Sequence, residues 1–290
     1  MNKSELLPEE HGPGKFTIIK PEHGLFQIDF REIWRYRDLI PLFARRDLKA
    51  EFSQTILGPL WFVIHPVTQA IVFSLIFGAL AKISTDGTMP FLFYNASLVL
   101  WTYFNSTATQ LSNVFLSSAG LFGKVYFPRL IVPISIALFR MVNLVVGFGL
   151  FLGFLFFFWW RGASVQPNLW VLATPLLVLQ TFILAFGVGI FASAFTTRYR
   201  DVVQAFGYVM SFWMYATPII YPFSQVPERW KWLFYLNPMS SVVEVFRHAY
   251  LGTSAVNFSL WAVNALTTVV VFVIGVIAFN YTEKTVVDTA

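Results

Sequence analysis

Neutral polar side chains recur at helical spacing inside two long apolar stretches of this sequence. The first set is separated by seven, three, four and four residues and comprises Asn95, Thr102, Asn105, Thr109 and Asn113. The second is separated by four, three and four residues and comprises Gln204, Tyr208, Ser211 and Tyr215. This spacing places each set on one face of a helix. Amides and hydroxyls there could hydrogen-bond the hydroxyl groups of a solute, or they could bond a neighbouring helix.

Neither polar face can meet the hydrocarbon of a membrane, because nothing there would satisfy its hydrogen bonds. Each face must therefore meet another helix or water. Bonding between helices would explain one such face, while two faces with few ionisable groups fit a neutral, hydroxyl-lined passage equally well, so both interpretations remain open. Aromatic residues make up 19% of the chain. Because their rings stack on the apolar faces of sugars, they favour a sugar polymer over an ion as the solute.

Arg140 is the one charged residue well inside an expected membrane span, about nine residues from the cytoplasmic end of that span. Placing arginine within a span costs about 2.5–3.5 kcal/mol, or less if the side chain reaches the interface. It therefore needs a partner or water. We expect it either to bond backbone carbonyls or the first polar face, or to contact an anionic head group during passage.

Catalytic and metal-binding motifs are missing from the sequence. It contains no GxxxxGK(S/T) phosphate loop, no HExxH motif and no cysteine. Asp201 is a single acid beside two arginines, which suggests a salt-bridged loop and not the acidic pair of a glycosyltransferase. The first five expected spans contain no Asp or Glu, whereas an ion-coupled transporter usually has a carboxylate near the membrane midplane. We expect no catalytic site, metal or cofactor on this chain.

The composition indicates an all-α integral membrane protein. Of the 290 residues, 57% are hydrophobic and 12% are charged. A bilayer core of about 30 Å needs about 20 mostly apolar residues per helix. Six stretches come close to this length, and we expect spans at 56–81, 91–115, 131–160, 169–195, 202–221 and 260–281. Together they form an expected transmembrane domain at 56–281.

The distribution of basic residues predicts the orientation of these spans. Fourteen Lys and Arg residues fall on the side of the two termini, against five on the other side. The positive-inside rule then places both termini in the cytoplasm, although the nine bases before residue 56 are matched by nine acids. The same rule places the loops at Lys124 and Arg200 in the cytoplasm.

The remaining segments flank the spans. Residues 1–24 form a tail, and 25–55 are expected to form an interfacial helix followed by a cytoplasmic elbow, with 282–290 as a cytoplasmic tail. The face made by Phe26, Phe30, Ile33 and Trp34 is typical of a helix at the membrane interface, or of one packed on a partner. Between the last two spans, four prolines break any continuous helix and predict short helices that re-enter the outer leaflet. Glu244 and Arg247 are spaced to pair on one of them.

Four motifs, in order, resemble the permeases of ABC-2 type polysaccharide exporters, and most closely the O-antigen permease group. They are RRDLKAEFSQTILGPLWFVIHP, LFGKVYFPRLIVP, RYRDV and TPIIYPFSQVPERWKWLFYLNP. The resemblance covers about residues 25–281. It implies a six-span permease of the bacterial inner membrane that forms a homodimer and binds two cytoplasmic ATPase subunits. Such a permease exports lipid-linked (undecaprenyl-type) O-antigen or a similar glycan. ATP and Mg²⁺ would bind the ATPase, and nucleic acid is not an expected partner.

The resemblance also assigns roles to residues. It assigns contact with the ATPase to two loops, which comprise Lys124, Tyr126, Phe127, Pro128 and Arg129 in the first and Arg198, Arg200 and Asp201 in the second. The elbow residues Arg45, Arg46 and Asp47 are weaker candidates for this contact. In the first of these loops we expect the two aromatic residues to be exposed. The outer re-entrant region would comprise Pro218, Tyr221, Pro222, Asn237 and Pro238. A teichoic acid or capsule exporter would share these motifs, and an ion-coupled secondary transporter is the alternative of a different class.

Overall fold

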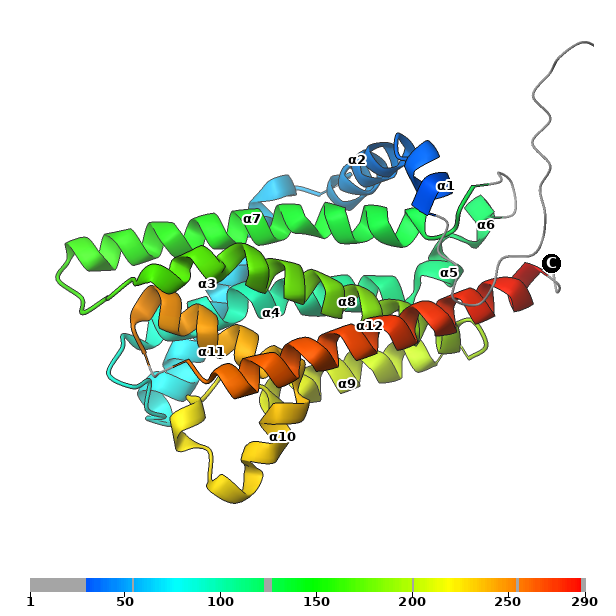
Figure 1. Cartoon of the computed structure of the whole chain (residues 1–290). Helices are drawn as coiled ribbons and strands as arrows, with labels where there is room; N and C mark the ends of the chain where they lie inside the picture. Colours follow the sequence, from blue (N-terminus) through cyan, green and yellow to red (C-terminus); the bar gives the residue numbers. More distant parts are fainter. Residues whose placement is uncertain (1–29, 54, 123–126, 200, 254–255, 288–290) are drawn as a thin grey trace, which may run out of the picture.

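The structure is a computed structural model of the chain, and it describes residues 30–53, 55–122, 127–199, 201–253 and 256–287. In these ranges it contains helices and no strands, which confirms the prediction of an all-helical chain. The long helices lie side by side in one bundle (Figure 1). The expected tail at 1–24, the first residues of the expected interfacial helix and residues 288–290 lie outside the described residues.

Four helical segments are long and apolar enough to cross a membrane. They are Gly58–Leu80, α7 (Ile131–Trp160), Leu169–Thr196, and Phe258–Thr282 within α12 (Phe258–Val287). The first is built from η1 (Gly58–Leu60), α3 (Trp61–Phe73) and the π-helical η2 (Ser74–Leu80). The third joins η3 (Leu169–Ala173) to α8 (Thr174–Thr196). These match four of the six expected spans.

The other two expected spans correspond to α4 and α9, which are more polar or shorter than these four. Helix α4 (Pro90–Ser112) has 23 residues and is long enough to span, but it carries many polar side chains. Helix α9 (Val202–Ala216) has 15 residues, or about 22 Å, which is shorter than a bilayer core. The predicted end of this span at residue 221 is wrong. Thr217 is extended, with ψ 143°, because a residue before proline is forced out of the helical region.

Helix α4 lies at the centre of the bundle. It packs against α8, α7, α3 and α9, and against α11 (Pro238–Leu251) at one end. Helix α8 also packs closely on α12. A Cβ atom on Gly187 would lie 2.6 Å from the Cα atom of Phe272, and one on Gly275 would overlap the carbonyl oxygen of Gly187. These two glycines allow α8 and α12 to approach closely.

The segments expected on the cytoplasmic side gather at one end of the bundle (Figure 1). They include α1 (Phe30–Arg35), α2 (Leu39–Phe52), α5 (Val114–Ser117) and α6 (Ala119–Phe122), with the start of α7 and the end of α12. Helix α2 lies alongside the first part of α7. The expected grouping of these segments is therefore present, whichever side of a membrane they occupy.

The segment between α9 and α12 folds into short helices at the opposite end of the bundle. These are η4 (Phe223–Gln225), η5 (Glu228–Trp230), α10 (Lys231–Leu236) and α11. Twelve of the fourteen residues of α11 are buried. Asn237 caps α11 by accepting a hydrogen bond from the backbone N–H of Met239 (3.1 Å). The segment thus folds back into the bundle instead of forming a loose loop.

Replacing Gly275 with leucine should destabilise the chain by about 1–3 kcal/mol, because the new side chain would force α8 and α12 apart. The measurement is thermal unfolding of the purified protein in detergent. Gly147→Leu in α7 is the matched control, since nothing lies within 4 Å of a Cβ added there. Equal melting temperatures for the two variants would contradict the close packing.

Candidate functional site

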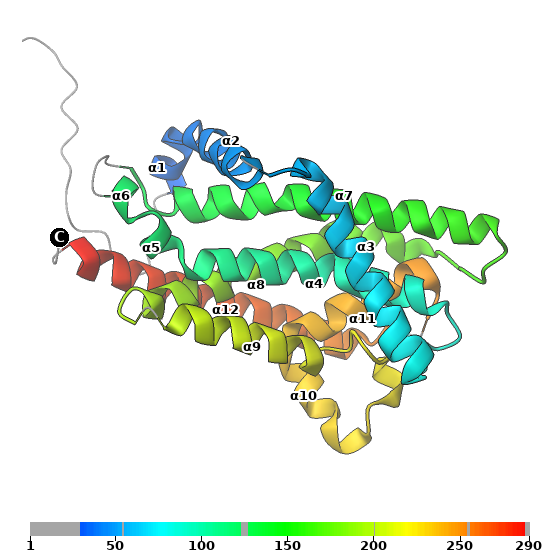
Figure 2. The same cartoon turned by 180° about the vertical axis from the view of Figure 1, so that it is seen from behind.

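The uncovered face of α4 is entirely polar. After Phe91, the residues of α4 that are not buried are Thr102, Asn105, Ser106, Thr109 and Gln110. Their spacing forms one stripe, and Asn113 continues it beyond the end of the helix. All six side chains are half-buried. Figure 2 shows α4 between α3 on one side and α9 on the other.

Most of the first predicted polar set lies on this stripe, but Asn95 does not. Asn95 is only 5% exposed and belongs to the interior of the bundle. Ser106 and Gln110 were not singled out from the sequence, although they follow Thr102 at intervals of four residues. Helical spacing thus identifies the polar face, while the depth of each residue depends on which helices cover α4.

Polar residues of α9 point away from the chain's own interior. Gln204, Tyr208, Ser211 and Tyr215 are all exposed, Tyr208 by 70%. The opposite face packs inward, and the Trp213 ring lies 5.2 Å from that of Phe104 in α4. Hydrogen bonding to another helix of the same chain therefore does not account for the polar face of α9.

Helix α3, which packs on α4, is only lightly buried. Ala70 is its one buried residue, whereas α8 has thirteen. The segment also contains Pro66 inside α3 and the π-helical turn η2, which are irregular features of a membrane helix. The segment Gly58–Leu80 is thus the least buried of the four candidate spans.

Arg140 has two side-chain partners, from α4 and α2. Its Nε donates to Oε1 of Gln110 (2.6 Å), and its Nη1 forms an ion pair with Oε1 of Glu51 (3.0 Å). The guanidinium also lies 5.3 Å from the centre of the Phe139 ring. Arg140 thus joins the polar face of α4 to the elbow helix, and Glu51 is a partner that sequence spacing could not reveal.

The expectation that Phe127 is exposed is wrong. Phe127 is 5% exposed, and its ring lies 5.7 Å from that of Phe43 in α2. It holds the elbow helix against the start of α7, so its ring does not form part of an exposed docking surface. Lys124, Tyr126 and Arg200 lie outside the described residues.

The other predicted contact residues lie at the same end of the bundle. Pro128 and Arg129 are half-buried, while Arg198 and Asp201 are exposed beside the turn between α8 and α9. The Arg198 guanidinium lies 5.5 Å from the centre of the Tyr199 ring. On α2, Arg45 is exposed and Arg46 pairs with Asp47 (2.8 Å). A contact role for these residues stays a prediction.

Asn237 organises the predicted outer region. Its side chain accepts from Nε1 of Trp213 (2.9 Å) and donates to the carbonyl oxygen of Ala216 (3.1 Å) and to Oγ1 of Thr217 (2.9 Å). These bonds join the end of α9 to the start of α11. Tyr221 is half-buried and donates its hydroxyl to the carbonyl of Tyr215 (3.0 Å). The three prolines predicted here, Pro218, Pro222 and Pro238, are buried.

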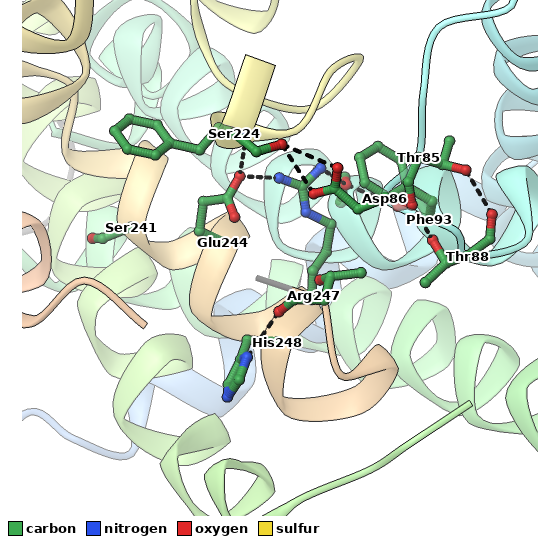
Figure 3. A network of polar contacts seen from close by, with 12 residues as sticks. Thr85, Asp86, Thr88, Phe93, Ser224, Ser241, Glu244, Arg247 and His248 are labelled. Atoms are coloured by element: carbon green, nitrogen blue, oxygen red, sulfur yellow. Dashed lines mark hydrogen bonds and ion pairs between the residues drawn. The ribbon is translucent and has the colours of Figure 1, made fainter. Parts of the chain in front are cut away.

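Next to this region, a charged network surrounds Arg247 (Figure 3). Arg247 is buried and pairs with Glu244, as their spacing predicts, and its guanidinium lies 4.2 Å from the centre of the Phe93 ring. Glu244 also accepts the backbone N–H of Phe223 (2.9 Å). From the loop before α4, Asp86 accepts the hydroxyl of Ser224 (3.0 Å). Among the described residues, His, Asp and Glu do not gather in groups that could hold a metal ion.

Comparison with known proteins identifies similar sequences. Residues 39–251 match the family model of the ABC-2 type transporter. The chain is 27% identical over 244 residues to the O-antigen export system permease protein RfbA of Klebsiella pneumoniae, covering 84% of this chain and 91% of that protein. A protein of the same name from Myxococcus xanthus is 25% identical over 221 residues, or 75% of this chain and 82% of that protein.

Cysteines at Asn105 and Tyr215 should react with a charged, membrane-impermeant thiol reagent if these faces meet water, because thiolate forms readily only in water. The chain has no native cysteine, so the labelling background is zero. Val145→Cys is the control, since Val145 is 67% exposed on the apolar surface of α7. We expect the two test positions to react at least about tenfold faster than this control. Equal rates would favour packing against protein.

Proposed function

We propose, given that this chain belongs to the ABC-2 type transporter family, that it is the membrane permease of a polysaccharide exporter. Its substrate would be a lipid-linked O-antigen or a similar surface glycan, moved outward across the bacterial inner membrane. The names of the relatives indicate this substrate class. The observation that carries the proposal is the neutral polar face of α4, which lies uncovered in a helix that otherwise packs at the centre of a membrane protein.

The chemistry of this face suits a sliding sugar chain. Hydroxyls and amides exchange hydrogen bonds with sugar hydroxyls at little net cost, since each bond replaces a similar bond to water. Exposed aromatic residues of α9, such as Tyr208 and Phe212, can stack on the apolar faces of sugar rings. Because the side chains of this face are neutral, successive sugars could pass without being held. Such a surface would conduct a long polymer with little discrimination between its units.

A second copy of the chain would enclose the passage. The polar residues of α9 are exposed in the single chain, and α4 and α9 are neighbours. Bringing two such surfaces together would surround the solute with polar groups and leave the apolar surface of α7 toward lipid. Each chain of this homodimer would cross the membrane six times, with α4 and α9 as two of the spans. Both termini would lie in the cytoplasm.

Energy for export would come from a separate ATPase. The sequence has no phosphate-binding loop of its own. The turn between α8 and α9, the segment before α7 and the elbow α2 would receive the motion of two ATPase subunits. In this arrangement Phe127 transmits motion from α2 to α7 through its contact with Phe43.

The proposed activity can be tested in proteoliposomes that contain the chain together with its ATPase. Lipid-linked O-antigen should become accessible to an impermeant lectin on the far side only when ATP is supplied. Transport driven by a proton or sodium gradient without ATP would contradict the proposal. Comparing a neutral glycan with a teichoic acid would identify the substrate class.

Arg198→Glu should reduce ATP-dependent export by about tenfold, because it reverses an exposed charge at the proposed ATPase contact. Export and co-purification of the ATPase should fall together, while the melting temperature stays unchanged. Arg229→Glu is the matched control, since Arg229 is an exposed arginine at the opposite end of the bundle. Normal export by Arg198→Glu would remove this turn from the coupling mechanism.

A further inference from the structure

The position of Arg140 along α7 sets its depth in the membrane. Trp159 and Trp160 are exposed at the far end of this helix, and tryptophan is enriched where a span leaves the hydrocarbon. From Trp160 back to Arg140 the helix rises about 30 Å, which equals the thickness of the hydrocarbon core. With the tryptophans at the outer interface, Arg140 lies at the inner edge of the core, next to the level of the lipid phosphates.

The neighbours of Arg140 belong to the elbow helix α2 and to α4, and a lipid head group at this depth would meet both. Helix α2 runs alongside α7, with Phe43 against Phe127 near the cytoplasmic end and Glu51 against Arg140 further along. Gln110 belongs to the polar face of α4. Arg140 therefore stands where the elbow helix meets the polar face.

The guanidinium of Arg140 suits a phosphate group as well as it suits Glu51. Arginine presents five N–H donors in a planar fork that matches both carboxylates and phosphates. The bonds to Gln110 and Glu51 use Nε and Nη1, so the outer edge of the fork retains donors. The side chains of Arg140 and Glu51 are 17% and 33% exposed, which leaves the pair within reach of a ligand.

We propose that Arg140, supported by Gln110, binds the phosphate group of a lipid at the inner membrane face, and that Glu51 is the internal carboxylate which this phosphate displaces. The ligand class is a diphosphate on a lipid, the group through which a lipid-linked glycan is joined to its carrier. The inference rests on the proposed function, and it names the site where the substrate enters.

Two features favour this lipid over an ordinary phospholipid. A diphosphate carries more negative charge than the single phosphodiester of a phospholipid, so it competes better with the carboxylate of Glu51. In addition, Gln110 lies on the polar face, so a sugar attached to a phosphate at Arg140 would begin its path beside Asn113 and Thr109. Displacing Glu51 would also remove one of the contacts that hold the elbow helix to α7, while Phe43 stays packed on Phe127. The end of the elbow helix near Glu51 could then move, which would signal to the ATPase side that substrate is present.

The experiment measures lipid binding to the full-length chain in nanodiscs by native mass spectrometry, with undecaprenyl diphosphate as the probe. Arg140→Gln should weaken binding by about tenfold, the usual effect of losing a charge-assisted hydrogen bond. Glu51→Gln should strengthen binding by several-fold, because it removes the competing carboxylate. The matched control is Arg161→Gln at the other end of α7, where an exposed arginine lies over the Phe157 ring, and it should bind as the unmodified chain does.

Opposite responses of the two variants are the signature of the site. If Arg140→Gln fails to fold, the proposal can still be tested, because it also requires Glu51→Gln to strengthen binding. If Glu51→Gln leaves binding unchanged or weakens it, the proposal is overturned. Equal binding of phosphatidylglycerol, or of free pyrophosphate, would assign the site to ordinary anionic lipids or to free phosphate and also overturn it. Export by the unmodified chain, measured separately, distinguishes failure of this site from failure of the proposed function.

Discussion

Hydrocarbon offers no hydrogen bonds, and this constraint governs the arrangement around α4. One side of this helix is closed by α8, where a Cβ atom on Gly189 would lie 2.5 Å from the Cβ atom of Leu111. The outer end is covered by α11, which places Arg247 over Phe93. Most residues of α4 that meet these neighbours are apolar or aromatic, although Asn95 and Ser97 are also buried. The neutral polar residues from Thr102 to Gln110 that are not buried lie on the remaining side. A polar face left uncovered in a membrane helix requires water or a second polar surface, and the proposed passage between two chains would supply both.

Because α9 is short, its last turn is bonded to the segment of short helices that follows it. Because α9 ends at Ala216, its last carbonyl groups need partners, and Asn237 supplies one of them by donating to the carbonyl of Ala216. The same side chain caps α11, so a single amide serves the end of one helix and the start of another. The wall of the proposed passage and the helices at its outer end are therefore held in fixed relation. A movement of α9 would be transmitted to α11 through this residue.

The sequence was sufficient to predict elements with strong local signals. The bounds of α7 agree with the prediction at both ends, because a long apolar run is interrupted by Pro128 and Arg129 before it and by Arg161 after it. The polar face of α4 followed from helical spacing. The burial of Phe127 could not be predicted, since it depends on Phe43, which is distant in sequence. Glu51 was missed for the same reason, because its partner Arg140 lies on another helix.

The modest strength of the Arg140–Glu51 pair is what allows it to be exchanged. A buried ion pair would be costly to separate, because each charge would be left without water. This pair is half-buried, so separating it costs less than separating a fully buried pair and more than separating an exposed surface pair, which contributes about 0–1 kcal/mol. Gln110 remains bonded to Nε while the partner on Nη1 changes, so the guanidinium keeps its orientation. A phosphate can then replace the carboxylate without disturbing α7, and the elbow helix loses one contact with α7 while Phe43 stays packed on Phe127. The exposed residues of the elbow helix lie at the end of the bundle where we propose that the ATPase binds.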